Sequence, residues 1–195
     1  INDGKIIIKV VETTDTEVRG TVVHGGTISN HKGINVPNVH LDIPALSNTD
    51  KEDLLFGVQM DVDYVAASFA RNKQDMLDLR KVRDDNGGEK IAIIAKIENM
   101  EGVENVDDIL DIADGIMVAR GDLGIEAGLE VVPIVQRKLI AFCRQYSKIC
   151  IVATQMMSSM VDSPEPTRAE VSDVANAVIQ GADAVMLSDE TANGE

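Results

Sequence analysis

The sequence predicts an α/β protein, namely a partial TIM (β/α)8 barrel with the tail of a small β domain at its N-terminus. Short apolar segments recur along most of the chain, and segments with amphipathic helical periodicity lie between them. Nearly every apolar segment ends in a polar or charged residue, as expected when all strand ends surround the mouth of a barrel. Closing a small barrel takes about eight strands, so we expect roughly three strands outside these residues.

The first part of the chain predicts a β hairpin. A turn signal at residues 2–4 precedes a β-branched segment at 5–11, and a second strand fits 17–24. Glycines at 25, 26 and 33 interrupt regular structure before the αβ pattern begins. We therefore assign residues 1–38 to the small β domain and residues 39–195 to the partial barrel.

Continuous apolar runs predict parallel strands that are buried on both faces. A doubly wound open sheet is the alternative, but its chemistry would gather at one switch point between two strands. Polar residues at nearly every strand end favour the barrel. The predicted strands are 64–68, 92–96, 115–120, 149–154 and 184–188.

Capping signals and apolar stripes predict the helices. Thr49 with Glu52 and Thr167 with Glu170 have the spacing of capping boxes. Apolar residues at helical spacing then predict core-facing stripes. The stripes are Met76, Leu79 and Val82; Val132, Val135, Leu139, Phe142 and Tyr146; and Val171, Val174, Ala175 and Val178.

The composition of the chain argues against several classes of partner and site. Eighteen Lys and Arg against thirty-three Asp and Glu give a net charge of −15, which argues against nucleic-acid or membrane partners. We see neither an apolar run of membrane-spanning length nor a secretory leader, and expect a cytoplasmic protein. The two cysteines, Cys143 and Cys150, lack zinc spacing and are expected to be buried free thiols.

Three charged residues are candidates for chemistry. Lys96 and Glu98 lie two residues apart at a strand end, so they should point the same way. Asp122 follows the next strand and should lie beside Glu98 at the same mouth. Two carboxylates supply the oxygen ligands that Mg2+ prefers, whereas a local ion pair is the alternative for Lys96 and Glu98.

Small and hydroxyl residues follow the same strands. Gly121 and Gly124 allow close approach of the backbone to a carboxylate or phosphate ligand. Thr154 and Ser188 end the last two strands, where each hydroxyl either contacts a ligand or bonds a neighbouring carbonyl.

The hairpin and its exit loop offer one further candidate. Lys32, followed by Gly33, is a candidate anion contact, although a solvated lysine is the ordinary state of such a residue. Surface positions are expected for His24, His31 and His40, which have no partners at metal-ligand spacing.

Several motifs, taken in order, resemble the pyruvate kinase family over nearly the whole chain. One such match would be weak evidence, but this many in the family's order are specific. They are the segment 32–37 (KGINVP), 66–69 (AASF), 96–99 (KIEN), 117–124 (MVARGDLG), 153–156 (ATQM), 166–170 (PTRAE) and 186–188 (MLS).

The resemblance implies phosphoryl transfer from phosphoenolpyruvate to ADP, giving pyruvate and ATP. Glu98 and Asp122 would hold Mg2+ or Mn2+, and Lys96 would neutralise charge on the transferring phosphoryl group. K+ would also be required, with ligands mostly outside these residues. The full-length protein would be a homotetramer.

By the same resemblance, the backbone around Gly121 and Asp122 would bind the substrate carboxylate. Thr154 would order the proton donor, with help from Ser188. Residues 1–38 would be the end of a lid domain, from which Lys32 would reach the nucleotide phosphates.

The chain departs from the family pattern after its last strand. Asp189 replaces a usual glycine, which would strain the backbone if this position needs positive φ, and Asn193 replaces a usual lysine. The family's first barrel strands and regulatory domain are not in the sequence, so these residues alone are expected not to turn over substrate. Two alternatives stay open: a Mg2+-dependent lyase or aldolase of the phosphoenolpyruvate/pyruvate barrel type, and a non-catalytic paralog.

Overall fold

The computed structural model describes residues 1–2, 4–30, 32–37, 39 and 43–194. The chain divides into two compact units, Ile1–Val39 and His40–Glu195. The sequence-based expectations for His31 and His40 fall outside the described residues.

The first unit contains a β hairpin, as predicted. Strand β1 (Ile7–Thr13) pairs antiparallel with β2 (Val18–His24). Thr14 closes the turn, because its backbone N–H donates to the Glu17 carbonyl at 2.8 Å and its Oγ1 accepts from the Glu17 N–H at 3.0 Å. The side chains of both strands are exposed.

The second unit is an α/β structure around a parallel sheet of five strands, all at predicted positions. Neighbouring strands in the sheet are also neighbours in the sequence, in the order β3-β4-β5-β6-β7, without the reversal of a doubly wound sheet. Every pairing is parallel. The strands are β3 (Tyr64–Ala67), β4 (Ala92–Ile97), β5 (Gly115–Ala119), β6 (Ile149–Ala153) and β7 (Ala184–Met186).

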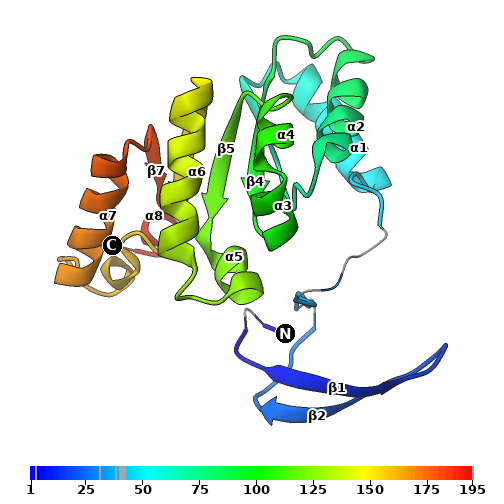
Figure 1. Cartoon of the computed structure of the whole chain (residues 1–195), viewed down its shortest axis with the longest axis vertical. Coiled ribbons are helices and arrows are strands. Elements are labelled where there is room, and N and C mark those ends of the chain that lie inside the picture. The colour runs from blue at the N-terminus through cyan, green and yellow to red at the C-terminus, as the bar shows by residue number, and fades with distance from the viewer. Residues whose placement is uncertain (3, 31, 38, 40–42, 195) are drawn as a thin grey trace. The chain divides into compact units, whose positions relative to one another are not determined.

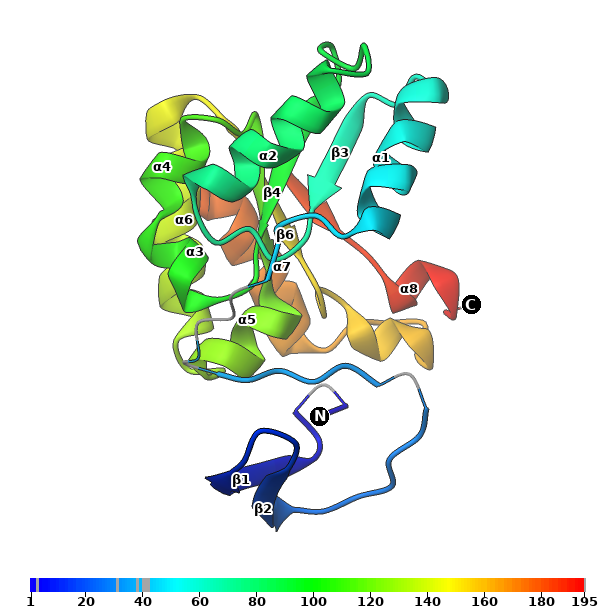
Figure 2. The ribbon, with the colours of Figure 1, turned by 90° about the vertical axis from the view of Figure 1, so that its right-hand side faces the viewer.

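Helices connect the strands and lie along one face of the sheet (Figures 1 and 2). Side chains from these helices and from one face of the sheet form the main core. The elements are α1 (Asn48–Gln59), α2 (Lys73–Asp84), α3 (Met100–Glu104), α4 (Val106–Leu110), α5 (Arg120–Ala127), α6 (Val132–Tyr146), the 3-10 helix η1 (Ser158–Val161), α7 (Arg168–Gln180) and α8 (Asp189–Ala192).

One of the two predicted capping boxes is confirmed. Thr167 and Glu170 cap α7 reciprocally. The prediction for Thr49 and Glu52 is wrong, because Ser47 and Asp50 form the box of α1, with N···O distances of 2.8 and 3.1 Å. Both pairs have the required spacing, and the observed N-cap, Ser47, lies two residues before the predicted one.

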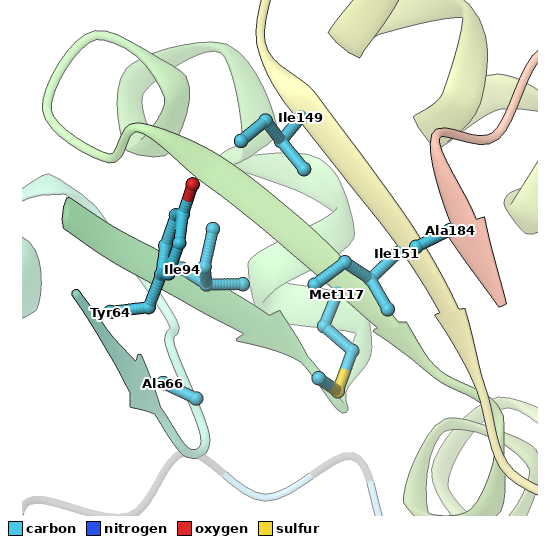
Figure 3. A pocket seen from close by; sticks show the side chains of 7 residues that line it. All are labelled: Tyr64, Ala66, Ile94, Met117, Ile149, Ile151 and Ala184. Atoms are coloured by element: carbon cyan, nitrogen blue, oxygen red, sulfur yellow. The ribbon is translucent and has the colours of Figure 1, made fainter. Parts of the chain in front are cut away.

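The two faces of the sheet have different surroundings. Alternation along each strand sends residues such as Ile93, Ala95 and Ile97 into the helix-covered core. Their neighbours Ile94 and Met117 belong to a separate small cluster on the other face. This second face forms a hollow of about 320 Å3, lined by Tyr64, Ala66, Ile94, Met117, Ile149, Ile151 and Ala184 (Figure 3).

The apolar stripe predicted for α7 is only partly buried. Ala177 is fully buried and Val174 packs against the core, but Val171 and Val178 are 55% and 60% exposed, and Ala175 is exposed too. Helix α7 lies beside the last strand of the sheet, so among the described elements only α6 and β7 pack closely against it. Tyr146, predicted to continue the stripe of α6, is also exposed and donates its hydroxyl hydrogen to Asp107 at 3.1 Å.

Candidate functional site

The candidate site begins with an ion pair at the carboxyl end of β4. Lys96 Nζ lies 2.8 Å from Glu98 Oε1, which confirms that the two side chains lie together. Glu98 is only 1% exposed, so its carboxylate is almost removed from water. Burying a carboxylate is costly unless it is paired and hydrogen-bonded, and Lys96 supplies the counter-ion.

The preceding strand contributes two further contacts that sequence reasoning missed. Lys96 Nζ donates to Ser68 Oγ at 3.0 Å. The backbone N–H of Phe69 donates to Glu98 Oε2, and Phe69 has a left-handed backbone with φ of 53°. Positive φ at an aromatic residue is rare, so this peptide is held in an unusual orientation that aims its N–H at Glu98. The sequence carries no signal for this.

Alternation relates the site to the second face of the sheet. Every second residue along a strand faces the same side of the sheet. Ala66, Ile94 and Ala184 line the hollow, and Ser68, Lys96 and Ser188, respectively, lie an even number of positions further along the chain. These residues therefore belong to the face that the helices do not cover, at the edge where the strands end.

Asp122 lies beyond the neighbouring strand. Ile97 of β4 is level with Val118 of β5, and β5 passes directly into α5, so Asp122 stands in the first turn of that helix. Carboxyl ends of adjacent parallel strands meet at one edge of a sheet, which places Glu98 and Asp122 at the same edge. Asp122 is half-buried, and no hydrogen bond or ion pair reaches its carboxylate within the described part of the chain.

The donor set suits a hard divalent cation that shares its coordination with substrate. Across the described residues there is no cluster of three or more His, Cys, Asp or Glu side chains that would enclose a metal. Mg2+ is usually held by one or two carboxylates together with waters and substrate oxygens, not by an all-protein cage. Glu98 and Asp122 fit that mode.

Gly121 and Thr154 lie against each other. A β-carbon at Gly121 would stand 3.1 Å from Thr154 Cγ2 and 3.7 Å from Thr154 Oγ1. The carboxyl ends of β5 and β6 therefore converge closely at these two candidate residues.

The backbone at Thr154 is strained. Thr154 and Gln155 have consecutive positive φ values of 78° and 54°. Such conformations cost about 1–3 kcal/mol each and persist only where the surroundings enforce them. Alternation along β6 would place Thr154 on the helix-covered face, but the left-handed turn interrupts that alternation after Ala153.

Ser188 and Lys32, the two remaining candidates, are both exposed. Ser188 is exposed, and its backbone N–H donates to Glu190 Oε2 at 2.8 Å. Lys32 and His24 are exposed in the first unit.

Asp189 and Asn193, the two residues that depart from the family pattern, contact each other. Asp189 opens α8 and is not among the positive-φ residues, so the condition for strain at this position is not met. Asn193 Nδ2 donates to Asp189 Oδ1 at 3.2 Å.

The described helices include none that is both long and apolar enough to span a bilayer.

The fold and the grouped residues define an α/β protein with a parallel sheet whose candidate polar site lies where the strands end. The sequence pattern of the family described as "Pyruvate kinase, barrel domain" matches residues 1–195. The chain belongs to the pyruvate kinase family.

Curated relatives agree with this assignment over the whole chain. It is 51% identical to a pyruvate kinase of Clostridium perfringens over 194 residues, which is 100% of this chain and 41% of the relative. It is 50% identical to that of Clostridium acetobutylicum, with the same coverage. For Geobacillus stearothermophilus the identity is 49%, over 100% of this chain and 34% of the relative. The chain therefore spans well under half the length of these relatives.

Proposed function

We propose that this chain supplies catalytic residues to a phosphotransferase that moves the phosphoryl group of phosphoenolpyruvate to ADP. The observation that carries the proposal is the Lys96–Glu98 ion pair, which lies at the same edge of the sheet as Asp122. This edge therefore combines a cation with two carboxylates that suit a divalent metal ion. Family membership and the named relatives support the same activity.

The reaction breaks the bond between phosphorus and the enol oxygen and forms one between phosphorus and a β-phosphate oxygen of ADP. The electron pair of the broken bond stays on the enol oxygen, and the resulting enolate takes a proton at its terminal carbon to become pyruvate. Such transfers depend mainly on positioning and charge stabilisation.

In this scheme Glu98 and Asp122 hold Mg2+ or Mn2+, which neutralises negative charge on the phosphoryl and enolate oxygens when bound. Lys96 adds positive charge where the phosphoryl group departs. Its ion pair with Glu98 and its hydrogen bond to Ser68 hold its ammonium group at the sheet edge. K+ is the second proposed cation.

Gly121, Asp122 and Thr154 receive the substrate in the proposal. Backbone N–H groups in the first turn of α5 have no partner within the helix and are suited to bind the substrate carboxylate. Thr154, which packs against Gly121, orders the proton donor for the enolate with Ser188. Lys32 contacts the nucleotide phosphates.

The finer architecture belongs to the same proposal. The parallel sheet is part of a TIM (β/α)8 catalytic barrel at 39–195, and residues 1–38 are the end of a small β-barrel lid domain. The full-length protein is proposed to be a cytoplasmic homotetramer. The hollow on the uncovered face of the sheet supports the barrel, because apolar side chains there need covering by further strands.

The test is a direct assay of the natural full-length protein with phosphoenolpyruvate, ADP, Mg2+ and K+. We expect pyruvate and ATP to form in equal amounts, and Glu98→Gln or Asp122→Asn to abolish both. ADP-independent cleavage of a carbon–carbon bond would instead favour the lyase or aldolase. A folded protein that neither turns over nor binds oxalate, an analogue of the enolate, with Mg2+ would favour the non-catalytic paralog.

A further inference from the structure

We propose that Arg120 is a positioning residue that holds Thr154 in its working conformation, and that Asp173 in turn holds Arg120. The proposal rests on the role of Thr154 proposed above. It assigns a function to a side chain that lies beside the candidate site without being a ligand of the metal or substrate.

Arg120 binds the backbone at the end of β6. Its Nε donates to the carbonyl oxygens of Ala153 and Thr154, each at 3.2 Å, and its Nη2 donates to the Thr154 carbonyl at 2.6 Å. The same Nη2 lies 3.0 Å from Met156 Sδ. The planar guanidinium presents several donors in a fixed fork, so one side chain holds both successive carbonyl groups.

The backbone at Thr154 needs this support. The described pairing of β6 with β5 ends at Ala153, so the Thr154 carbonyl lies beyond the strand ladder. Its φ of 78° is unusual for a β-branched residue and persists only where neighbouring groups enforce it. Arg120 binds the carbonyl group of this residue through both Nε and Nη2.

A second layer of contacts fixes Arg120 itself. Its Nη1 lies 2.7 Å from Asp173 Oδ2 on α7 and 3.4 Å from Gln136 Oε1 on α6. The Arg120 side chain is only 11% exposed, whereas the Asp173 side chain is 37% exposed, so water screens this ion pair from the Asp173 side alone. The end of β6 is thus connected through one guanidinium to two helices of the core.

Lysine at this position would keep the charge and lose the geometry. An ammonium group is a compact charge with no planar fork, so it cannot hold both carbonyls and Asp173 in their present positions. Arg120→Lys should therefore displace Thr154 while leaving Glu98 and its contacts with Lys96 and Phe69 intact.

The experiment isolates the proton step in the natural full-length protein. Removal of a methyl proton from pyruvate gives the enolate, which takes up a deuteron from D2O, and NMR follows the loss of methyl protons. We expect Arg120→Lys to slow this exchange by roughly 10- to 100-fold, the scale of a misplaced catalytic group. Binding of oxalate with Mg2+ should stay close to that of the wild type.

A double-mutant cycle tests whether Arg120 acts through Thr154. In a Thr154→Ala background we expect Arg120→Lys to cause little further slowing, because the group it positions is already gone. The matched control is Arg137→Lys, an exposed arginine on α6, which should leave exchange unchanged. Asp173→Asn is the second variant and should reproduce part of the effect if Arg120→Lys does not fold.

Each result separates this proposal from the proposed function. Wild-type exchange and turnover, with undiminished exchange in both Arg120→Lys and Asp173→Asn, would overturn the role of Arg120 alone. The same would follow from an equal loss in the wild-type and Thr154→Ala backgrounds. A folded wild type without phosphoryl transfer would overturn the proposed function and this proposal together. Full exchange in Thr154→Ala would overturn the proposed role of Thr154, and with it the role of Arg120.

Discussion

Gly121, which follows β5, packs directly against Thr154, which follows β6: a β-carbon at Gly121 would stand 3.1 Å from Thr154 Cγ2. Gly121 is not among the positive-φ residues, so its backbone conformation does not require glycine. The restriction is the space beside Thr154.

Gly121→Ala should therefore lower turnover more than stability. The new methyl group must displace Thr154 by a few tenths of an ångström, whereas alanine is favoured over glycine in a helix by about 1 kcal/mol. We expect a clear fall in kcat in a pyruvate-forming assay, with the urea midpoint changed little. Thr154→Ser removes Cγ2 and keeps the hydroxyl, so the double variant should regain activity. Failure of that rescue would show that the contact is not the cause.

Lys96→Met should destabilise the protein as well as inactivate it. The substitution leaves the nearly fully buried Glu98 carboxylate without its counter-ion, a loss of about 2–4 kcal/mol in unfolding free energy. Glu98→Gln should cost less, because the amide carries no charge. Lys73→Met is the matched control: its pair with Asp111, at 2.9 Å, has side chains 44% and 50% exposed, so water screens it and its loss should change the unfolding free energy little. Equal urea-unfolding losses for Lys96→Met and Lys73→Met would contradict the argument.

Much of the second unit was predictable because its strands are continuous apolar runs, although the expected burial on both faces is not found for the edge strands β3 and β7, which are largely exposed. Continuous apolar runs ending in polar residues identified all five parallel strands, and the alternation of side chains brought Lys96 and Glu98 together. These features depend on local sequence and on a rule that applies to any parallel sheet.

Other features depend on long-range contacts that no local pattern encodes. Arg120 looked like a strand end, but it opens α5 and reaches the carbonyls of Ala153 and Thr154 on another strand. Positive φ at Phe69 and Thr154 had no glycine to signal it. The exposed part of the α7 stripe, including Val178, shows that periodicity identifies an apolar face but not whether a neighbour covers it.

Cys143 and Cys150 should be unreactive in the native protein. Both thiols are buried and free, as predicted. A hydrogen bond with Cys143, together with burial, raises the pKa of Cys150 well above its ordinary value, which suppresses the nucleophilic thiolate. We expect no labelling by a thiol reagent such as DTNB at neutral pH, and labelling of both residues after unfolding in urea. Rapid labelling of either cysteine before unfolding would contradict this placement.

Glu170 should make stability depend on pH in a strongly acidic range. Its carboxylate accepts hydrogen bonds from Ser159 Oγ, the Ser159 N–H and the Thr167 N–H, and these lower its pKa from 4.5 to about 2. The folded state thus favours the charged form, so the stabilisation is complete above the unfolded pKa near 4.5 and disappears as the pH falls through about 2.

Comparing the Tm of the wild type with that of Glu170→Gln checks the direction of this pH dependence. We expect the wild type to have the higher Tm at pH 6, because the carboxylate ties η1 to the first turn of α7, and the difference to shrink steadily between pH 4.5 and pH 2. Glu165→Gln removes the same charge from an exposed position in the same connection and should change Tm little throughout. A difference between wild type and Glu170→Gln that stays constant down to pH 2 would mean that the hydrogen bonds do not depend on the charged form of Glu170.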